Sequence, residues 1–351
     1  MDKIYKKKFI DKSITFVGII ILYCFVTIFD KNISSLIKGL LVQFCVYSIM
    51  AVSLNLVVGI SGELSLGHAG FMCLGAFISA TFTTYMKSVF GIQNIYIFII
   101  AILIGGIVTA FFGFLIGIPV LRLKGDYLAI VTLAFGEIIK NVLNAIYLGV
   151  DKKGLHISLK NAMSLLLDDD GVVIIKGPQG ITNIPHYSNF LIAVVLLIIT
   201  VFVIYNIIDQ RTGRAIMALR DNRIAGESIG LNVTKYKLIA FTISSAFAGI
   251  AGVLYAHNYN NIAATGAKFG YNMSIMILVF VVLGGMGNIR GSIISAVVLT
   301  LLPEALRSLQ DFRMLMYAIV LIAVMIFTNA PFAINFRKNL KFVKGNRKDE
   351  Q

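Results

Sequence analysis

The sequence predicts an all-α fold, a polytopic transmembrane helical bundle of about ten spans with the N- and C-termini cytoplasmic. Of the 351 residues, 58% are hydrophobic and 14% are charged, whereas about a quarter of a soluble domain is charged. The mean hydropathy is +0.87. The lysines and arginines, which give a formal net charge of +14, cluster in short segments between long apolar runs. That pattern is typical of membrane orientation signals, and it argues against a nucleic-acid-binding protein.

Each span is predicted from the thickness of the hydrocarbon core, which a helix of about 20 apolar residues crosses. Helices are required because lipid offers no partner for an exposed backbone amide. The first apolar run follows a basic segment, but no small-residue cleavage site comes after it, so we interpret it as an uncleaved span. In order, the predicted spans are residues 14–29, 36–58, 66–85, 96–118, 127–148, 190–208, 238–257, the stretch 273–302, and 315–330.

The stretch 273–302 is too long for one ordinary span and is interrupted by the glycine-rich segment 284–291. One long tilted helix would place the basic C-terminal tail outside. Two short helices around the glycines would instead cross the membrane twice and place this tail on the same side as the other basic clusters, the cytoplasmic side. We favour this arrangement. The predicted cytoplasmic segments are then residues 1–13, the turn at Arg122 and Lys124, residues 209–237 and residues 335–351.

Residues 149–188 form the predicted external loop. This loop mixes lysines with aspartates and contains the turn-forming sequence GPQG at 177–180. Its length and polarity fit either a partly structured cap or a flexible insertion. Because no linker or low-complexity tract divides the chain, we predict a single membrane domain over residues 1–351.

Signatures of catalysis are absent from the sequence. No phosphate-binding loop of the GxxxxGK[ST] type occurs, so the chain is not expected to hydrolyse nucleotide. The four histidines have no metal-ligand spacing, and the three cysteines are scattered through apolar runs. We therefore predict no catalytic residue, no metal site and no cofactor in this chain. Polar residues within spans become the candidates for function, because they are costly in lipid.

The first group of such residues lies in the segment 55–70, which contains Asn55, Ser65 and His68 among glycines. One interpretation is a break in the helix that lines a solute pathway at membrane depth. The other is close helix packing through the glycines.

The second group lies on the fifth predicted span and consists of Thr132, Glu137, Lys140 and Asn141. Glu137 and Asn141 are four residues apart, so they share one face of a helix. Either this face lines the pathway, or Glu137 pairs with Lys140 three residues later as a structural ion pair.

The basic loop 209–237 carries the pattern of a short amphipathic helix. Asp221 is suited to cap its N-terminus and Gly230 to end it, which brackets about two turns. Arg223 and Glu227 are spaced to pair. This helix either docks into a groove of a partner protein or lies on lipid headgroups. Its apolar and small side chains share one face: Ile224, Ala225, Ser228 and Ile229.

Four segments resemble the permease subunits of branched-chain amino-acid ABC transporters, of the LivM type. They are SLNLVVGISGELSLGHAGFMCLG at 53–75, GDYLAIVTLAFGE at 125–137, the segment 213–255 that begins GRAIMALRDNRIAGESIGLN, and LGGMGNIRG at 283–291. The turn GPQGI at 177–181 is also similar to a glycine-rich turn of that family. The segments occur in the expected order and span nearly the whole membrane region.

The resemblance implies that the whole chain is one permease domain in the bacterial cytoplasmic (inner) membrane, and that 209–237 is its coupling loop. Its implied partners are a homologous second permease subunit, two ATPase chains that use ATP and Mg, and a periplasmic or lipid-anchored solute-binding protein. The helix of the coupling loop would sit in a cleft of the ATPase. The implied coupling residues are Arg214, Arg220, Asp221, Arg223, Ile224, Glu227, Ile229 and Gly230.

The implied solute is a branched-chain or related amino acid. Three alternatives remain open at the level of sequence. Permeases for urea or short amides have similar segments, and a secondary transporter would couple to protons through Glu137. A membrane-embedded enzyme would use Glu137 and His68 as acid and base.

Overall fold

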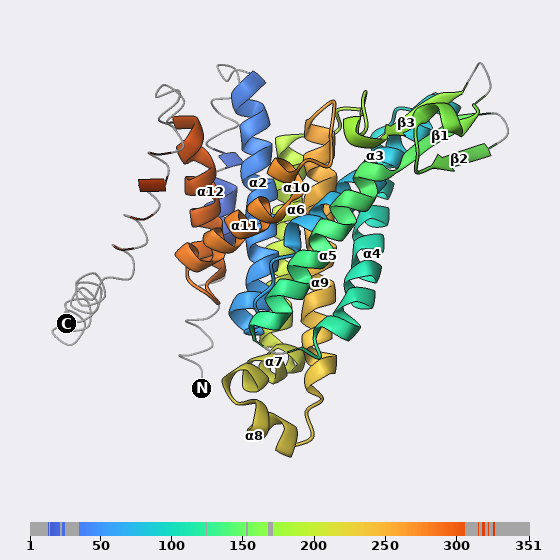
Figure 1. Ribbon diagram of the computed structural model, residues 1–351. Helices are drawn as coiled ribbons and strands as arrows, with labels where there is room; N and C mark the ends of the chain where they lie inside the picture. The colour runs from blue at the N-terminus through green and yellow to red at the C-terminus, as the bar shows by residue number, and fades with distance from the viewer. Residues whose placement is uncertain are drawn as a thin grey trace. The chain divides into compact units, whose positions relative to one another are not determined.

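The computed structural model describes residues 13, 15–21, 23–24, 35–123, 125–151, 154–167 and 171–305, and the single positions 315, 318, 319, 322 and 326. The chain divides into two compact units, Met1–Val297 and Val298–Gln351. The helical bundle described below belongs to the first unit (Figure 1). Residues 14, 22 and 25–29 of the first predicted span lie outside the described residues, as do most of the span 315–330 and nearly all residues of the two predicted tails.

Within the part of the chain that the structure describes, seven helical segments are long and apolar enough to cross a membrane. They confirm a polytopic helical membrane protein, while the total of about ten spans stays a prediction. The segments are α2 (Ser35–Asn55) with the π-helix η2 (Leu56–Ile60), α3 (His68–Phe90), α4 (Ile95–Val120), α5 (Asp126–Ala145), α6 (Phe190–Asp209), α9 (Val233–Asn258), and α10 (Gly266–Phe269) with α11 (Tyr271–Gly284).

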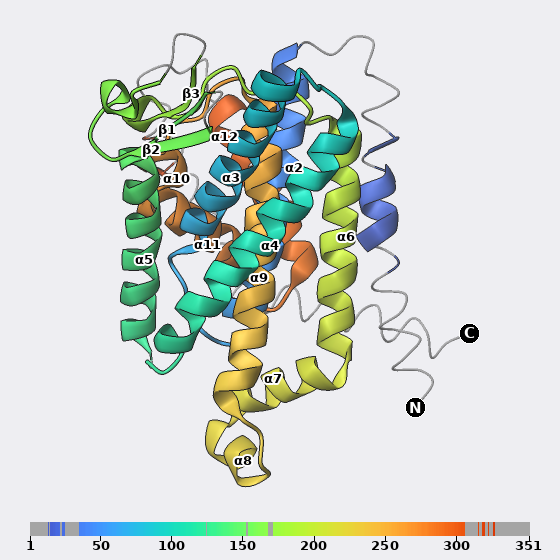
Figure 2. The same cartoon turned by 90° about the vertical axis from the view of Figure 1, so that its right-hand side faces the viewer.

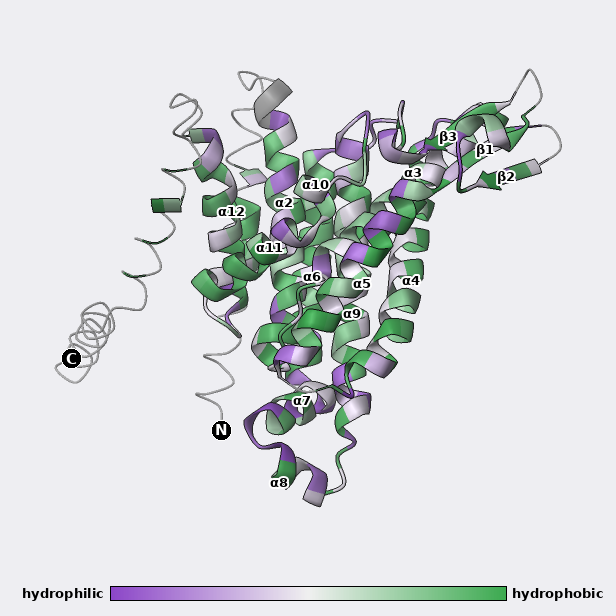
Figure 3. Ribbon diagram, in the orientation of Figure 1, coloured by the Kyte–Doolittle hydropathy of each residue, from purple (hydrophilic) through white to green (hydrophobic). Residues whose placement is uncertain are grey.

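Helix α9 occupies the centre of the bundle and packs on α2, α3 and α4 (Figures 1 and 2). Small residues allow this approach, because apolar helices in lipid gain little from hydrophobic burial and associate through close packing. A Cβ on Gly75 would lie 2.3 Å from Gly249 O, and one on Gly252 would lie 2.0 Å from Met72 O. The exposed side chains of α4 are apolar, as contact with lipid requires (Figure 3).

The predicted interruption of the stretch 273–302 is confirmed. α11 ends at Gly284 and α12 (Ile289–Ala305) begins five residues later. A Cβ on Gly291 would lie 1.7 Å from Gly284 O, and Ser295 Oγ donates to Phe280 O. Gly284 thus faces Gly291, and Phe280, which comes earlier in α11, faces Ser295, which comes later in α12. The facing parts of the two helices therefore run antiparallel. We name this element the helical hairpin.

A small antiparallel sheet follows α5, in the order β2-β1-β3, and lies at the opposite end of the bundle from α7 and α8 (Figures 1 and 2). The strands are β1 (Tyr147–Asp151), β2 (Gly154–Ser158) and β3 (Val172–Lys176), with short 3₁₀-helices η3 (Ala162–Leu165) and η4 (Gly177–Gln179). The predicted loop 149–188 thus contains a structured cap. The predicted end of the span 127–148 is wrong, because α5 stops at Ala145 and β-sheet pairing takes over from Tyr147.

The sheet is tied to the bundle through the loop after α9. Ile181 and Ile262 exchange backbone hydrogen bonds of 2.9 and 3.0 Å, and Ile184 N–H donates to Asn260 O at 3.0 Å. These bonds satisfy backbone groups of two loops that are about 80 residues apart in sequence, and so hold the cap against the end of α9.

Candidate functional site

The helix break, residues 56–67, follows α2 directly inside the bundle. The π-helix η2 ends where Ser61 N–H donates to Leu56 O at 3.1 Å. Next comes Gly62 with a φ of +74°, a conformation that other residues rarely adopt. The chain then continues without regular structure until α3 begins at His68. The predicted break is confirmed.

Close packing through glycines, the other interpretation of the segment 55–70, occurs in the same region, while a solute pathway along the break stays a prediction. A Cβ on Gly67 would lie 2.2 Å from Thr132 O, and one on Gly70 would lie 2.5 Å from the Gly136 Cα. These glycines let α5 approach the start of α3 at backbone distance. The break therefore lies against α5 as well as against α2.

Asn55 connects the helix break to the helical hairpin. Its side chain is fully buried, and both ends of its amide are used. The Nδ2 group donates to Ser292 Oγ at 2.9 Å, and Oδ1 accepts from Gly287 N–H at 2.8 Å. A Cβ on Gly59 would lie 2.2 Å from Gly287 N, so the two turns touch. An unpaired amide at this depth would cost several kcal/mol, which explains why each partner is present.

The end of the break is held by side chains that replace missing helical hydrogen bonds. His68 Nε2 lies 2.8 Å from Ser53 Oγ, so the chain returns alongside the helix that it has just left. Leu66 N–H donates to Thr132 Oγ1 at 3.0 Å, and Ala69 N–H donates to Ser274 Oγ at 3.1 Å. Thr132 and His68 thus stabilise the break from within the bundle.

Ser65 behaves differently from the other predicted pathway residues. Its side chain is buried, and its hydroxyl has no hydrogen-bond partner among the described residues. Ser61, at the start of the extended segment, shares this property. Unsatisfied buried hydroxyls are unusual in native proteins. They place two free donors in the part of the break that has no regular structure.

Glu137 and Lys140 on α5 form an ion pair, as one of the two interpretations predicts. Glu137 also accepts from the Tyr271 backbone N–H at 2.7 Å, and so caps the first turn of α11. Asn141 is exposed. Within the described part of the chain, His68 bonds to Ser53 and Glu137 bonds to Lys140 and Tyr271, so the acid and base of the enzyme alternative are not bonded to each other.

The predicted coupling loop, residues 209–237, contains two helices where the sequence predicts one. α7 (Arg211–Asp221) follows α6 directly, and α8 (Arg223–Ser228) comes after it. The predicted N-cap is wrong by one residue, because Asp221 ends α7 and Asn222 Oδ1 accepts from Ala225 N–H at 3.1 Å. Asn is as good an N-cap as Asp, so the signal was present in the sequence. The predicted stop at Gly230 is confirmed by its φ of +83°.

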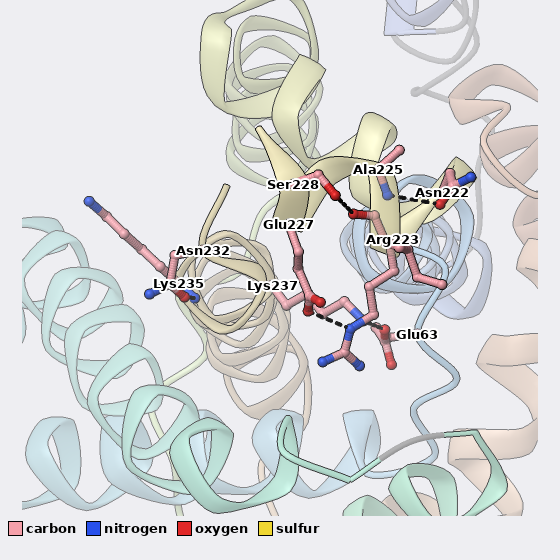
Figure 4. A network of polar contacts seen from close by, with 10 residues as sticks. Glu63, Asn222, Arg223, Ala225, Glu227, Ser228, Asn232, Lys235 and Lys237 are labelled. Carbon is pink, nitrogen blue, oxygen red and sulfur yellow. Dashed lines mark hydrogen bonds and ion pairs between the residues drawn. The ribbon is translucent and has the colours of Figure 1, made fainter. Parts of the chain in front are cut away.

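Two contacts attach the coupling loop to the helix break. The Arg220 guanidinium donates to Gly59 O at 2.8 Å and to Asp221. Lys237, at the start of α9, pairs with Glu63, and both side chains are mostly buried (Figure 4). No local pattern in the sequence predicts either contact, because they join segments about 160 to 175 residues apart. An arginine predicted to face a partner protein is thus used within the chain.

Two large apolar side chains are exposed at α8, one on the helix and one at its C-cap. Ile224 and Ile229 are 77% and 75% exposed, although apolar side chains of this size are usually buried in soluble regions. The predicted pair of Arg223 and Glu227 is confirmed at 2.9 Å (Figure 4). Gly226 places α8 against α7, since a Cβ there would lie 2.6 Å from the Leu219 side chain. The isoleucines are therefore presented on a supported helix.

Arg214, the last of the predicted coupling residues, is exposed on α7. Among the described residues, no group of three or more His, Cys, Asp or Glu side chains could hold a metal ion.

Comparison with known proteins identifies what the chain is similar to. A family model described as "Branched-chain amino acid transport system / permease component" matches residues 36–328. The high-affinity branched-chain amino acid transport system permease protein LivM of Salmonella typhimurium is 35% identical, over 87% of this chain and 72% of its own length. The Escherichia coli LivM protein is 34% identical over the same shares.

A more distant relative is the probable branched-chain amino acid transport permease protein LivM of Methanocaldococcus jannaschii, which is 26% identical over 73% of this chain and 77% of its own length. No solved structure matches the chain significantly.

Proposed function

The chain belongs to the family of permease components of branched-chain amino acid transport systems, and we propose that α7 and α8 couple its solute pathway to a partner ATPase. It is a multi-pass membrane permease subunit and not itself an enzyme. ATP is used by the partner. The bacterial inner membrane is its proposed location, with the coupling loop on the cytoplasmic side.

The observation that carries the proposal is the pair of exposed isoleucines, Ile224 on α8 and Ile229 at its C-cap, because α8 follows α7, which is bonded to the interior of the bundle through Arg220. Ile224 and Ile229 expose most of their side chains, and side chains that fill pockets of a partner carry most of the binding energy of a protein interface. Arg223, Glu227 and Arg214 surround them with charge, as the rim of an interface does. A lipid headgroup surface fits less well, because acidic Glu227 lies on the same two-turn helix.

The coupling route begins at Arg220. ATP-driven closure of the ATPase pair would displace α8 and α7, and Arg220 would carry this displacement to Gly59 O in η2. A π-helix is held by fewer favourable hydrogen bonds than an α-helix, so it is a suitable point for a change between two arrangements. Asn55 then links η2 to the helical hairpin. Inward and outward access would alternate through this connected region.

The proposed assembly contains a homologous second permease subunit, two ATPase chains and a periplasmic or lipid-anchored solute-binding protein. Branched-chain or related amino acids are the proposed solutes. Six residues are proposed to line or to support the pathway: Asn55, Ser65, His68, Thr132, Glu137 and Asn141. A proton-coupled transporter is less well supported, since Glu137 is held by Lys140 and by the Tyr271 amide.

The test replaces both exposed isoleucines with glutamate, Ile224→Glu and Ile229→Glu. We expect the variant to insert normally but to lose copurification with the ATPase and at least about tenfold of ATP-driven leucine uptake, because charge replaces an apolar anchor. Ile157→Glu, on the outer strand of the sheet and also exposed, is the matched control. Uptake and ATPase binding equal to those of the control, or uptake by the purified chain without any ATPase, would overturn the proposal.

A further inference from the structure

An ion pair lies within the membrane-spanning part of the chain and is only partly buried. Glu137 is the twelfth of the 20 residues of α5, so it lies eight residues, or about 12 Å, from the end of that helix. The Lys140 and Glu137 side chains retain 13% and 23% exposure. Charged groups within a span almost always face a polar space or a partner, because lipid contact is costly.

The hydrogen-bonding capacity of the pair is not exhausted. Lys140 has three donors, and among the described residues its ion-pair partner is Glu137 alone. The Glu137 carboxylate accepts from Lys140 and from the Tyr271 amide, which leaves lone pairs free on its two oxygens. The pair thus offers a positive donor and a negative acceptor side by side, with no net charge.

The surroundings combine polar and apolar groups. Asn141 lies one turn after Glu137 on the same face of α5, and Tyr271 is half exposed at the start of α11. Ile275, four residues after Tyr271 and therefore on the same face of α11, is exposed to 40%. α11 contacts α5 here. The ion pair is thus bonded to the first residue of α11, and an exposed apolar side chain, Ile275, lies one helical turn further along that helix.

We propose that Glu137 and Lys140 bind the ammonium and the carboxylate of a zwitterionic α-amino acid during transport. This inference rests on the proposed permease function and deepens it by assigning the residues that contact the solute. Lys140 binds the solute carboxylate, Glu137 binds the solute ammonium, and the aliphatic side chain lies toward Ile275. When the solute binds, the ion pair between Glu137 and Lys140 is replaced by two ion pairs, one from each side chain to the zwitterionic solute. Each charge keeps a partner, so no uncompensated charge enters the membrane.

The same arrangement distinguishes two solute classes that sequence resemblance leaves open. Urea and short amides carry no formal charge, so they cannot compensate Glu137 and Lys140 if these two side chains separate, and the ion pair stays closed. An α-amino acid satisfies both groups with charge-assisted hydrogen bonds, which are about twice as strong as neutral ones.

The first experiment measures solute binding directly in the purified full-length permease. The chain contains no tryptophan, so Tyr271→Trp introduces a single fluorophore beside the Glu137 contact while leaving the backbone amide in place. L-Leucine is expected to change the emission saturably, whereas urea, 3-methylbutylamine and 4-methylpentanoate are not. Adding Glu137→Gln with Lys140→Met should abolish the leucine response. No leucine response, or an equal response to urea, overturns the inference.

The second experiment measures ATP-driven L-leucine uptake by the complete assembly. Glu137→Gln with Lys140→Met keeps a hydrogen-bond acceptor for Tyr271 N–H and leaves no unpaired charge, so a merely structural pair would tolerate it. We expect uptake to fall about tenfold or more while ATPase copurification is unchanged. Uptake equal to wild type overturns the inference alone. A wild-type permease that does not copurify with the ATPase would instead contradict the proposed function.

Discussion

Single glycines decide how closely the central helices approach. A Cβ on Gly75 would lie 2.3 Å from the Gly249 carbonyl oxygen, which is backbone and cannot rotate away. At Gly39 on α2, by contrast, the nearest heavy atom outside the helix backbone is 4.0 Å away. Glycine is thus required at position 75, whereas position 39 has room for a larger side chain.

We expect Gly75→Ala to destabilise the protein by about 1 to 3 kcal/mol, because the added methyl group forces α3 and α9 apart. Gly39→Ala is the matched control, and it should be neutral or slightly stabilising because alanine favours the helix. Thermal unfolding of the two variants in detergent measures the difference. Equal melting temperatures for both would contradict the packing argument.

Arg220 bonds to residues of its own chain, although its place in the sequence predicts a contact with a partner protein. Its position in a basic cytoplasmic loop predicts a contact with a partner, yet its guanidinium is bonded to Gly59 O and to Asp221. We expect Arg220→Gln to leave ATPase copurification nearly intact while leucine uptake falls about tenfold, since a charge-assisted bond to η2 is lost. A variant that loses ATPase binding and uptake in parallel would indicate a direct interface role instead.

At the scale of elements, the buried pair of Glu63 and Lys237 fastens the helix break to the start of α9. Both side chains are 13% exposed. We expect Lys237→Met alone to destabilise the protein by about 3 kcal/mol, because it leaves Glu63 unpaired in a poorly solvated site. The double variant Glu63→Gln, Lys237→Met should recover most of this loss.

The comparison of single and double variants by heat denaturation tests that coupling. A double variant as unstable as the sum of the two single variants would show that the pair does not interact. The helix break itself is expected to depend on such cross-links, since it has few internal hydrogen bonds.

At the scale of the whole molecule, the proposed orientation places the sheet outside and the coupling loop in the cytoplasm. We expect a membrane-impermeant maleimide to label Met163→Cys in intact cells and Ala225→Cys only after permeabilisation, in a background lacking Cys24, Cys45 and Cys73. Both target positions are exposed, so the two variants control for each other. Labelling of both from the same side would contradict the orientation.

Sequence alone determined the membrane class, the positions of most spans, the interruption after Gly284 and the family, because these depend on local composition and short motifs. It also predicted the pairing of Arg223 with Glu227, which are four residues apart on one helix. The cap residue of α8 and the end of α5 were misplaced by a few residues, because neighbouring polar or apolar residues compete for those positions.

Only the tertiary structure decided how the coupling loop relates to the membrane interior. The contacts of Arg220 with Gly59, of Lys237 with Glu63 and of Asn55 with the helical hairpin join segments that are far apart in sequence. No local pattern encodes them, since each depends on which helices pack together. The proposed coupling loop, whose role follows from the family and not from charge or spacing, is thereby one end of a bonded route into the bundle.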